Sequence, residues 1–175
     1  MRKRLFIWEL AGFLWTGAAG TALHFLHEWA PFVWTAVVSA VNESIWEHMK
    51  LLVVPVFLFT VVQVCALGQR YPNLAAVRAV TAVLGTLAIP VMYYTYTGAF
   101  GIQSVWVDIL IFFLADGLLF WLDFRLLRRG ALGSGWQQIL GLAVLWGLLF
   151  AFVWCTFRPP ALPLFQDPVT GKFGL

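Results

Sequence analysis

The sequence predicts an all-α membrane protein, a bundle of five transmembrane helices plus one short re-entrant or interfacial helix. Of the 175 residues, 62% are hydrophobic and only 11% are charged, whereas a soluble domain has roughly a quarter of its residues charged. Several apolar runs also reach the ~20 residues that a helix needs to cross a bilayer. These runs do not show the alternation expected of a transmembrane β-barrel.

Helix-breaking and turn-forming residues divide the chain into its predicted elements. The first long run ends at Trp-Ala-Pro, because proline is poorly tolerated inside a helix, and the Gly-rich stretch RRGALGSG separates the last two runs. The segment after the first run has only about eleven residues, too few to span a membrane. We expect long helices at about residues 3–29, 43–68, 73–97, 104–128 and 136–157, and a short helix at about residues 31–41.

The chain shows no internal repeat and no linker, so we expect a single integral membrane domain over residues 1–175. The tail, residues 158–175, has too many prolines and glycines to be helical. We expect it to fold as a lid over the mouth of the polar pocket that is described below. The basic start MRKR is not interpreted as part of a cleaved signal peptide, because Glu9 interrupts the apolar run.

Basic residues predict the orientation. Lysines and arginines gather in the N-terminal MRKR, around Arg70 and Arg78, and in the loop that contains Arg128. Short loops rich in Lys and Arg stay in the cytoplasm, so five crossings place the N-terminus inside and the tail outside. No basic face is present, which argues against a nucleic-acid partner.

Ionisable residues concentrate in the stretch ALHFLHEWAPFVWTAVVSAVNESIWEHMKLL, residues 22–52. In the predicted topology this stretch lies at the outer side of the membrane. Ionisable groups within a membrane are costly and usually functional. We therefore predict a polar pocket that opens outward, with the lipid bilayer around it.

A divalent metal, zinc for example, is the predicted cofactor of this pocket. Imidazole nitrogens and carboxylate oxygens are good zinc ligands, and His24, Glu47 and His48 are the expected ligand set. Glu28 or Glu43 would be the fourth ligand or the general base. At 100° per residue Glu43 and Glu47 share one helix face. The spacing matches none of the named zinc motifs.

The preferred functional prediction is a metal-dependent membrane-embedded enzyme that acts on a lipid or a lipophilic small molecule. A metal ion would make hydroxide available by lowering the pKa of its bound water. The predicted catalytic residues are Glu43, Glu47 and His48. The predicted substrate contacts are Asn42, Trp46, Tyr94, Tyr96 and Asp108, with Asn42 also the expected N-cap of the helix that follows it.

Three alternatives stay open at this point. A carboxylate beside a histidine also suits metal-free acid–base chemistry. Asp116 should lie near the bilayer midplane with Lys50 or Glu9 as its partner, which favours a proton- or ion-coupled carrier or channel. Buried polar residues also tie membrane helices together, as in a non-catalytic binding or assembly protein. For a carrier, a homodimer would supply the space for transport that the five helices of one chain lack. Asp123 is expected to be a solvated cytoplasmic residue.

The motifs N-E-S-x-W-E-H, in VNESIWEHMKLLVVP, and D-P-x-T-G, in PLFQDPVTGKFG, resemble those of a family of small bacterial polytopic membrane proteins whose function is uncharacterised. The resemblance covers the chain from LHFLHEW through YTYTG to the tail. It implies a shared fold and no activity. We expect the protein to lie in the bacterial cytoplasmic (inner) membrane.

Overall fold

The computed structural model describes residues 2–175, and every long element in that part of the chain is a helix. The prediction of an all-helical protein is therefore confirmed. The helices are α1 (Arg2–Trp29), α2 (Val33–Val38), α3 (Ile45–Leu67), α4 (Leu74–Phe100), α5 (Val105–Arg129) and α6 (Gly135–Phe157), followed by the single 3₁₀ turn η1 (Pro163–Phe165).

Four of these helices, α3, α4, α5 and α6, are long and apolar enough to cross a membrane. The fifth long helix, α1, has 28 residues and packs against α3 and α5 within the same bundle. Its sequence is less apolar, because it carries basic residues at its start and Glu9, His24, His27 and Glu28 further on. The short helix α2 has only six residues.

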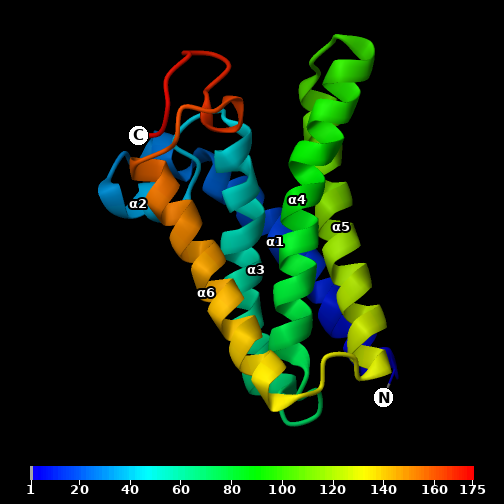
Figure 1. Cartoon of the computed structure of the whole chain (residues 1–175). Coiled ribbons are helices and arrows are strands. Elements are labelled where there is room, and N and C mark those ends of the chain that lie inside the picture. The colour runs from blue at the N-terminus through cyan, green and yellow to red at the C-terminus, as the bar shows by residue number, and fades with distance from the viewer. Residues whose placement is uncertain (1) are drawn as a thin grey trace.

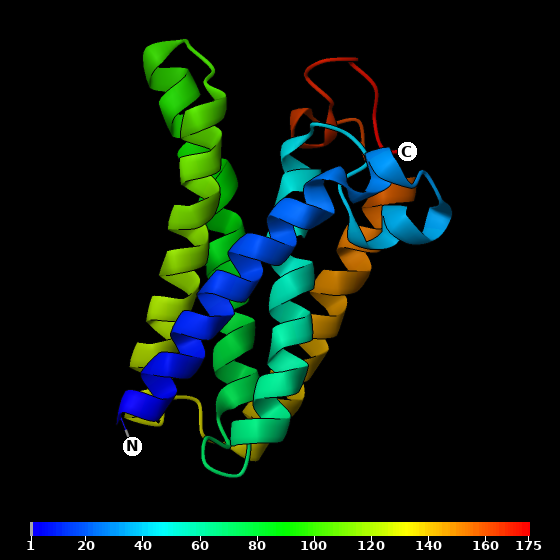
Figure 2. The same ribbon diagram turned by 180° about the vertical axis from the view of Figure 1, so that it is seen from behind.

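The long helices form one bundle whose two ends differ (Figure 1). One end carries the α3–α4 and α5–α6 connections and the start of α1, and we call it the inner end after the predicted orientation. The other, the outer end, carries α2, the α4–α5 turn and the tail. Seen from behind, α1 crosses the bundle diagonally, and the tip of the α4–α5 hairpin lies apart from α2 and the tail (Figure 2).

Small residues permit the closest helix contacts, as is usual between membrane helices. A Cβ at Gly20 of α1 would come within 2.8 Å of the Leu51 backbone oxygen on α3. A Cβ at Gly141 of α6 would come within 2.6 Å of Ala76 Cα on α4. Trp15 of α1 also donates a hydrogen bond to the Pro55 carbonyl on α3, at 3.0 Å. These contacts join α1 to α3 and α4 to α6.

The start of α3 differs from the prediction. Its N-cap is Ser44, whose hydroxyl accepts from the Glu47 N–H at 3.4 Å, whereas Asn42 was expected there. Asn42 lies two residues earlier, and its Oδ1 accepts from the Ser44 N–H at 2.9 Å. Ser44 has extended backbone angles, so Glu43 lies outside the helix. The helical angle between Glu43 and Glu47 therefore does not apply.

Candidate functional site

The helix α2 folds back onto the end of α1 and thereby shapes the outer end. Ser39 accepts a hydrogen bond from the His27 N–H at 3.0 Å and donates one to the Leu23 carbonyl at 2.5 Å. Thr35 Oγ1 lies 3.0 Å from His27 Nδ1. These bonds connect α2 to the last turns of α1, so the chain returns to the start of α3 close to His24.

Three of the predicted residues meet at this point. His24 of α1 and Glu43 and His48 at the start of α3 each present one ligand atom, and these three atoms lie within 4.8 Å of one another. The rings of His24 and His48 are 5.1 Å apart between centroids. Because α1 and α3 are neighbours in the bundle, residues distant in sequence converge here. We call His24, Glu43 and His48 the open cluster.

The hydrogen bonds of His48 determine which ring nitrogen faces the cluster. Its Nδ1 lies 2.9 Å from the Ser44 carbonyl oxygen, and a carbonyl only accepts, so Nδ1 carries the hydrogen. In the neutral ring, Nε2 therefore carries the lone pair. Nε2 lies 3.5 Å from Glu43 Oε2. Two electron-rich atoms in this position need a proton or a cation between them.

The remaining atoms of the open cluster also lack partners or face solvent. His24 Nδ1 is buried and has no hydrogen-bond partner. The Glu43 side chain is 51% exposed and that of His48 is 35% exposed. A backbone bond on one ring nitrogen with the other nitrogen free is the usual arrangement of a metal-ligating histidine. The open cluster thus combines the donor types of a metal site with two side chains that are partly exposed to solvent.

Glu47 is not part of this cluster, although the sequence suggested it as a ligand. Its Oε2 pairs with Lys50 Nζ at 2.5 Å, and its Oε1 accepts from Thr156 Oγ1 at 2.8 Å. Lys50 Nζ also donates to Thr156 Oγ1 at 2.8 Å and to the Ala36 carbonyl at 2.9 Å. We call Glu47, Lys50 and Thr156 the closed cluster. Both charged side chains are buried and satisfied, so Glu47 has no free lone pair directed at a metal.

The tail covers the closed cluster. Asn42 Nδ2 donates to the Gly174 carbonyl at 3.0 Å, and the Leu175 N–H donates to the Thr156 carbonyl at 2.9 Å. Gly174 has φ +64°, and a Cβ there would approach the Thr156 oxygen to 2.7 Å, which explains the glycine. The tail, predicted as a lid, is thus an ordered part of the outer end. Asn42 therefore binds the tail directly.

Trp46 also has a packing role where a substrate contact was predicted. Its ring stacks on Phe152 of α6 with 4.3 Å between centroids, and it lies 4.6 Å from Phe165 of η1. Phe165 is buried. Trp46 therefore joins α3, α6 and the tail, and its indole N–H is buried without a partner.

The tyrosines at the end of α4 contact α5 instead of the open cluster. Tyr96 donates from its hydroxyl to Asp108 Oδ1 at 2.6 Å and accepts from the Ser104 N–H at 3.2 Å. Tyr94 is exposed. The tip of the α4–α5 hairpin lies apart from α2 and the tail in both views (Figures 1 and 2). The predicted gathering of Tyr94, Tyr96 and Asp108 with the histidines is therefore not observed.

A second polar group lies towards the inner end, and the sequence reading missed its composition. Arg78 of α4 is buried and pairs with Asp123 of α5 at 2.9 Å and with Glu9 of α1 at 3.6 Å. Gln63 of α3 donates to Glu9 at 2.7 Å and accepts from Arg78 at 2.5 Å. Thr81 donates to Asp123 at 2.7 Å. We call Glu9, Gln63, Arg78, Thr81 and Asp123 the inner network.

Three predictions about buried charged residues were wrong. Asp123 is completely buried, not a solvated cytoplasmic residue, and Arg78, counted with Arg70 among the basic residues that set the orientation, is buried within α4. Asp116, expected to pair with Lys50 or Glu9, pairs with neither, because Lys50 belongs to the closed cluster and Glu9 to the inner network. The sequence did contain one signal for this network. Arg78 is the fifth residue of the apolar helix α4, and a charged residue in such a position needs a buried partner.

Glu28 is exposed and lies four residues after His24 on α1. That spacing places it one helical turn further out on nearly the same face. It is not among the three residues whose ligand atoms converge. Glu28 is therefore adjacent to the open cluster, whereas His27 is turned towards Thr35.

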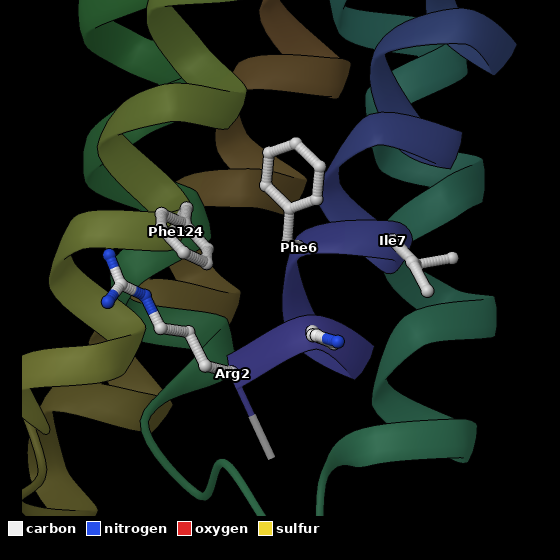
Figure 3. Close-up of a pocket in the computed structure, with 5 residues that line it drawn as sticks. Arg2, Phe6, Ile7 and Phe124 are labelled. Atoms are coloured by element: carbon white, nitrogen blue, oxygen red, sulfur yellow. The ribbon is translucent and has the colours of Figure 1, made fainter.

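One hollow on the surface lies at the inner end, away from all of these groups. It has a volume of about 660 Å³ and is lined by Arg2, Lys3, Phe6, Ile7 and Phe124. Figure 3 shows the Phe6 ring between α1 and α5, and its centroid lies 5.9 Å from that of Phe124. No residue that the sequence singled out for chemistry lines this hollow.

The fold and the site together define the class of protein. An all-helical bundle with four apolar helices of membrane-spanning length and buried charged groups is typical of polytopic membrane proteins. The chain belongs to a protein family of unknown function (DUF6512), which matches residues 3–175. Neither a curated protein nor a solved structure matches the chain.

Proposed function

We propose that the open cluster binds a divalent transition metal such as zinc, and that the protein is a metal-dependent membrane enzyme acting on a lipid or a lipophilic small molecule. The observation that carries the proposal is the convergence of His24, Glu43 and His48, whose ligand atoms lie within 4.8 Å of one another. Two histidines and one glutamate form a ligand set that catalytic zinc sites use, with water as the fourth ligand.

The electrostatics of the site favour a bound cation. His48 Nε2 faces Glu43 Oε2 at 3.5 Å while its Nδ1 is engaged with a carbonyl. A metal ion between them would be held by the lone pair of Nε2 and by the carboxylate. One ring nitrogen of His24 completes the set. Histidine orientation by a backbone carbonyl also raises the basicity of the ligating nitrogen.

The chemistry proposed for this site is hydrolysis. A divalent metal lowers the pKa of its bound water towards neutrality, and the resulting hydroxide would attack the carbonyl carbon or phosphorus of an ester. The bond to the leaving oxygen breaks, and that oxygen takes up a proton to leave as an alcohol. Glu28, exposed and one turn beyond His24, is the proposed general base, because Glu43 is a ligand and Glu47 is engaged with Lys50.

The surroundings of the open cluster favour a lipophilic substrate. Phe25 and Trp29 stack beside His24 on α1, with 5.8 Å between their centroids, and Trp29 is 72% exposed. Phe32 and Trp34 at α2 are also exposed. Aromatic side chains of this kind gather at membrane–water interfaces. A substrate that partitions into the bilayer would reach the site along this surface.

The proposed topology has five crossings in the bacterial inner membrane, with the N-terminus in the cytoplasm and the tail outside. Supporting it, the start of α1 and the tail lie at opposite ends of the bundle (Figure 1). The 28 residues of α1 would extend about 42 Å, enough for a core of ~30 Å. The short α2 would lie in the interface.

Metal analysis of the purified protein tests the site. We expect about one zinc ion per chain after purification with zinc present, and its loss in His24→Ala, His48→Ala and Glu43→Gln variants. His27→Gln is the matched control, because His27 is the neighbouring histidine and its ring faces Thr35. A wild-type protein that binds no divalent metal, or that retains it in all three variants, would refute the proposal.

Turnover separates an enzyme from a non-catalytic binding or assembly protein, which stays the alternative. We expect hydrolysis of short-chain ester or phosphoester substrates in detergent, abolished by a chelator and restored by zinc. Glu28→Gln should lower kcat with zinc still bound. A protein that binds zinc stoichiometrically but hydrolyses none of a panel of lipid esters would favour the structural or assembly alternative.

Labelling of cysteines tests the topology. With Cys155 replaced, the native Cys65 near the inner end of α3 is exposed on the bundle surface and gives an inner reference. A cysteine introduced at Gly101 in the α4–α5 turn should react with a membrane-impermeant reagent added outside. Reaction of that residue only after the cells are opened would invert the proposed orientation.

A further inference from the structure

Asp116 lies at the middle of α5 and is fully buried. Both of its carboxylate oxygens are without a hydrogen-bond partner in the described chain, residues 2–175. Thr16 of α1 and Thr86 of α4 are also buried, and their hydroxyls likewise lack partners. A buried polar group without a partner is unfavourable, and more so if it is charged. These three groups therefore require an explanation.

The three unpartnered groups lie at one level of the bundle. Asp116, Thr16 and Thr86 are seven or eight residues from Asp123, Glu9 and Arg78 respectively. Because a helix rises 1.5 Å per residue, each lies about 10–12 Å from the inner network, in the direction of the outer end. A Cβ at Gly85 would approach the Ala115 carbonyl oxygen to 3.2 Å, and these two residues adjoin Thr86 and Asp116.

An aromatic layer separates this level from the inner network. Phe120 is four residues after Asp116 and three before Asp123 on α5. The Arg78 guanidinium lies over its ring, 4.7 Å from the centroid. Phe59 meets the same ring edge-on at 5.9 Å, and Phe120 fills the space where a Cβ at Gly12 would lie. Arg78 Nε and Nη1 remain unpartnered on their side of the layer.

The buried charges do not balance. Glu9, Asp116 and Asp123 are three acids, and Arg78 is the one base that pairs with any of them among residues 2–175. Two negative charges would stay uncompensated if all three acids were ionised, which is strongly unfavourable in a membrane interior. Protons are the smallest cations able to restore the balance without a ligand cavity.

We propose that Asp116 is a proton-binding site, and that it exchanges its proton with the inner side of the membrane through the inner network when Phe120 moves aside. In each transfer an O–H bond at Asp116 breaks and one forms on an intervening water and then on Asp123. The proton leaves Asp123 towards the inner end, and no electron is moved. The ion pair with Arg78 stabilises Asp123 in its ionised form between transfers.

Other titratable groups lie on the helices that pack against α5, which are α1 and α4. At the outer end these include His24, His27 and Glu28 of α1, the tyrosines of α4 and Asp108 of α5 itself. At the inner end they include Arg2, Lys3, Arg4 and Glu9 of α1, Arg78 of α4 and Asp123 of α5. The Glu47–Lys50 pair lies on α3 and is satisfied within the closed cluster. None of these is a hydrogen-bond partner of Asp116.

Infrared spectroscopy of the full chain in lipid tests the proton-binding site. We expect the C=O stretch of a buried protonated carboxylic acid in the wild type, its loss in Asp116→Asn, and its retention in Asp108→Asn. Asp116→Glu should keep the band at a shifted frequency. This variant retains a carboxyl group at residue 116, so it shows that the band comes from that group and is not lost through misfolding. A wild-type spectrum without a band that depends on residue 116 would overturn the proposal.

Transfer to D₂O tests the relay, because the band shifts when the proton is replaced by a deuteron. We expect Phe120→Ala to speed this exchange by about tenfold or more. Asp123→Asn should slow it. Phe113→Ala, on the outer side of Asp116 on the same helix, is the matched control and should leave the rate unchanged. Equal acceleration by both phenylalanine variants would refute access from the inner side through Phe120. Neither result depends on metal binding at the open cluster.

Discussion

The open and closed clusters begin within the same eight residues, Glu43 to Lys50, yet their environments are opposite. In the closed cluster, Lys50 Nζ has three acceptors, and both Glu47 oxygens are hydrogen-bonded. In the open cluster, the Glu43 carboxylate is half exposed, and His24 Nδ1 has no partner. The two clusters therefore share residue types but differ in how fully their hydrogen-bonding groups are satisfied. Groups with spare bonding capacity near solvent are the ones able to bind a ligand.

Removing one member of the closed cluster should give the largest effect on stability. Lys50→Met leaves the Glu47 carboxylate buried without its cation, and we expect a loss of about 3–5 kcal/mol in the free energy of unfolding. Chemical unfolding in detergent measures it. Lys172→Met, at an exposed lysine of the tail, is the control and should change stability by less than ~0.5 kcal/mol. A loss below ~1 kcal/mol for Lys50→Met would show that the Glu47 carboxylate does not depend on Lys50 for its burial.

The open cluster should respond to metal instead. A free zinc concentration 100 times the Kd should stabilise the wild type by about 2.7 kcal/mol. His48→Ala should abolish this zinc-dependent stabilisation while changing the metal-free stability by less than ~1 kcal/mol, because the ring is partly exposed. Thermal unfolding with and without zinc makes the comparison. Equal zinc stabilisation in the variant would place the metal elsewhere.

Ser44 connects the two clusters, because it caps the helix that carries them both. Ser44→Ala removes the acceptor of the Glu47 N–H, and we expect a loss of about 1 kcal/mol. Ser104 at the start of α5 makes no such bond through its side chain, so Ser104→Ala should be close to neutral. Similar effects of the two substitutions would mean that the cap contributes little.

The smallest effect on stability is expected at Glu28. Its side chain is exposed, so Glu28→Gln should alter the free energy of unfolding by less than ~0.5 kcal/mol. Zinc affinity, measured by competition with a chromophoric chelator, should stay within a few fold, because three ligands remain. A loss of about 10–100-fold or more would instead make Glu28 a fourth ligand or a group that orients one.

The difference between Glu43 and Glu47 shows where the sequence reading failed. Both were expected on one helix face, since they are four residues apart. The helix begins at Ile45, however, with Ser44 as its cap, so Glu43 leaves the helical register and reaches His48. Asn42 and Ser44 are both good caps, and no local rule chooses between them. In the structure Ser44 is the cap, and Asn42 instead donates to Gly174, a residue 132 positions away in the chain.

Much of the fold was nevertheless readable from local patterns. The helices α3 to α6 lie within a few residues of their predicted bounds, because long apolar runs and the turns between them define such helices. The prediction that His24 and His48 meet at one end of the bundle agrees with the structure. The bilayer imposes helices of near-constant length, so the sequence by itself determined the helical class and the ends at which polar groups gather.

Only the tertiary structure decided the pairing of those groups. Arg78 and Asp123 are 45 residues apart and meet because α4 packs beside α5. Lys50 reaches Thr156 on α6, 106 residues away, instead of Asp116. The physical reason is that a buried charge takes whichever partner helix packing brings within about 3 Å. That packing depends on close contacts of Gly12, Gly20 and Gly141 with neighbouring helices. A single sequence does not show which residue each of these glycines will contact.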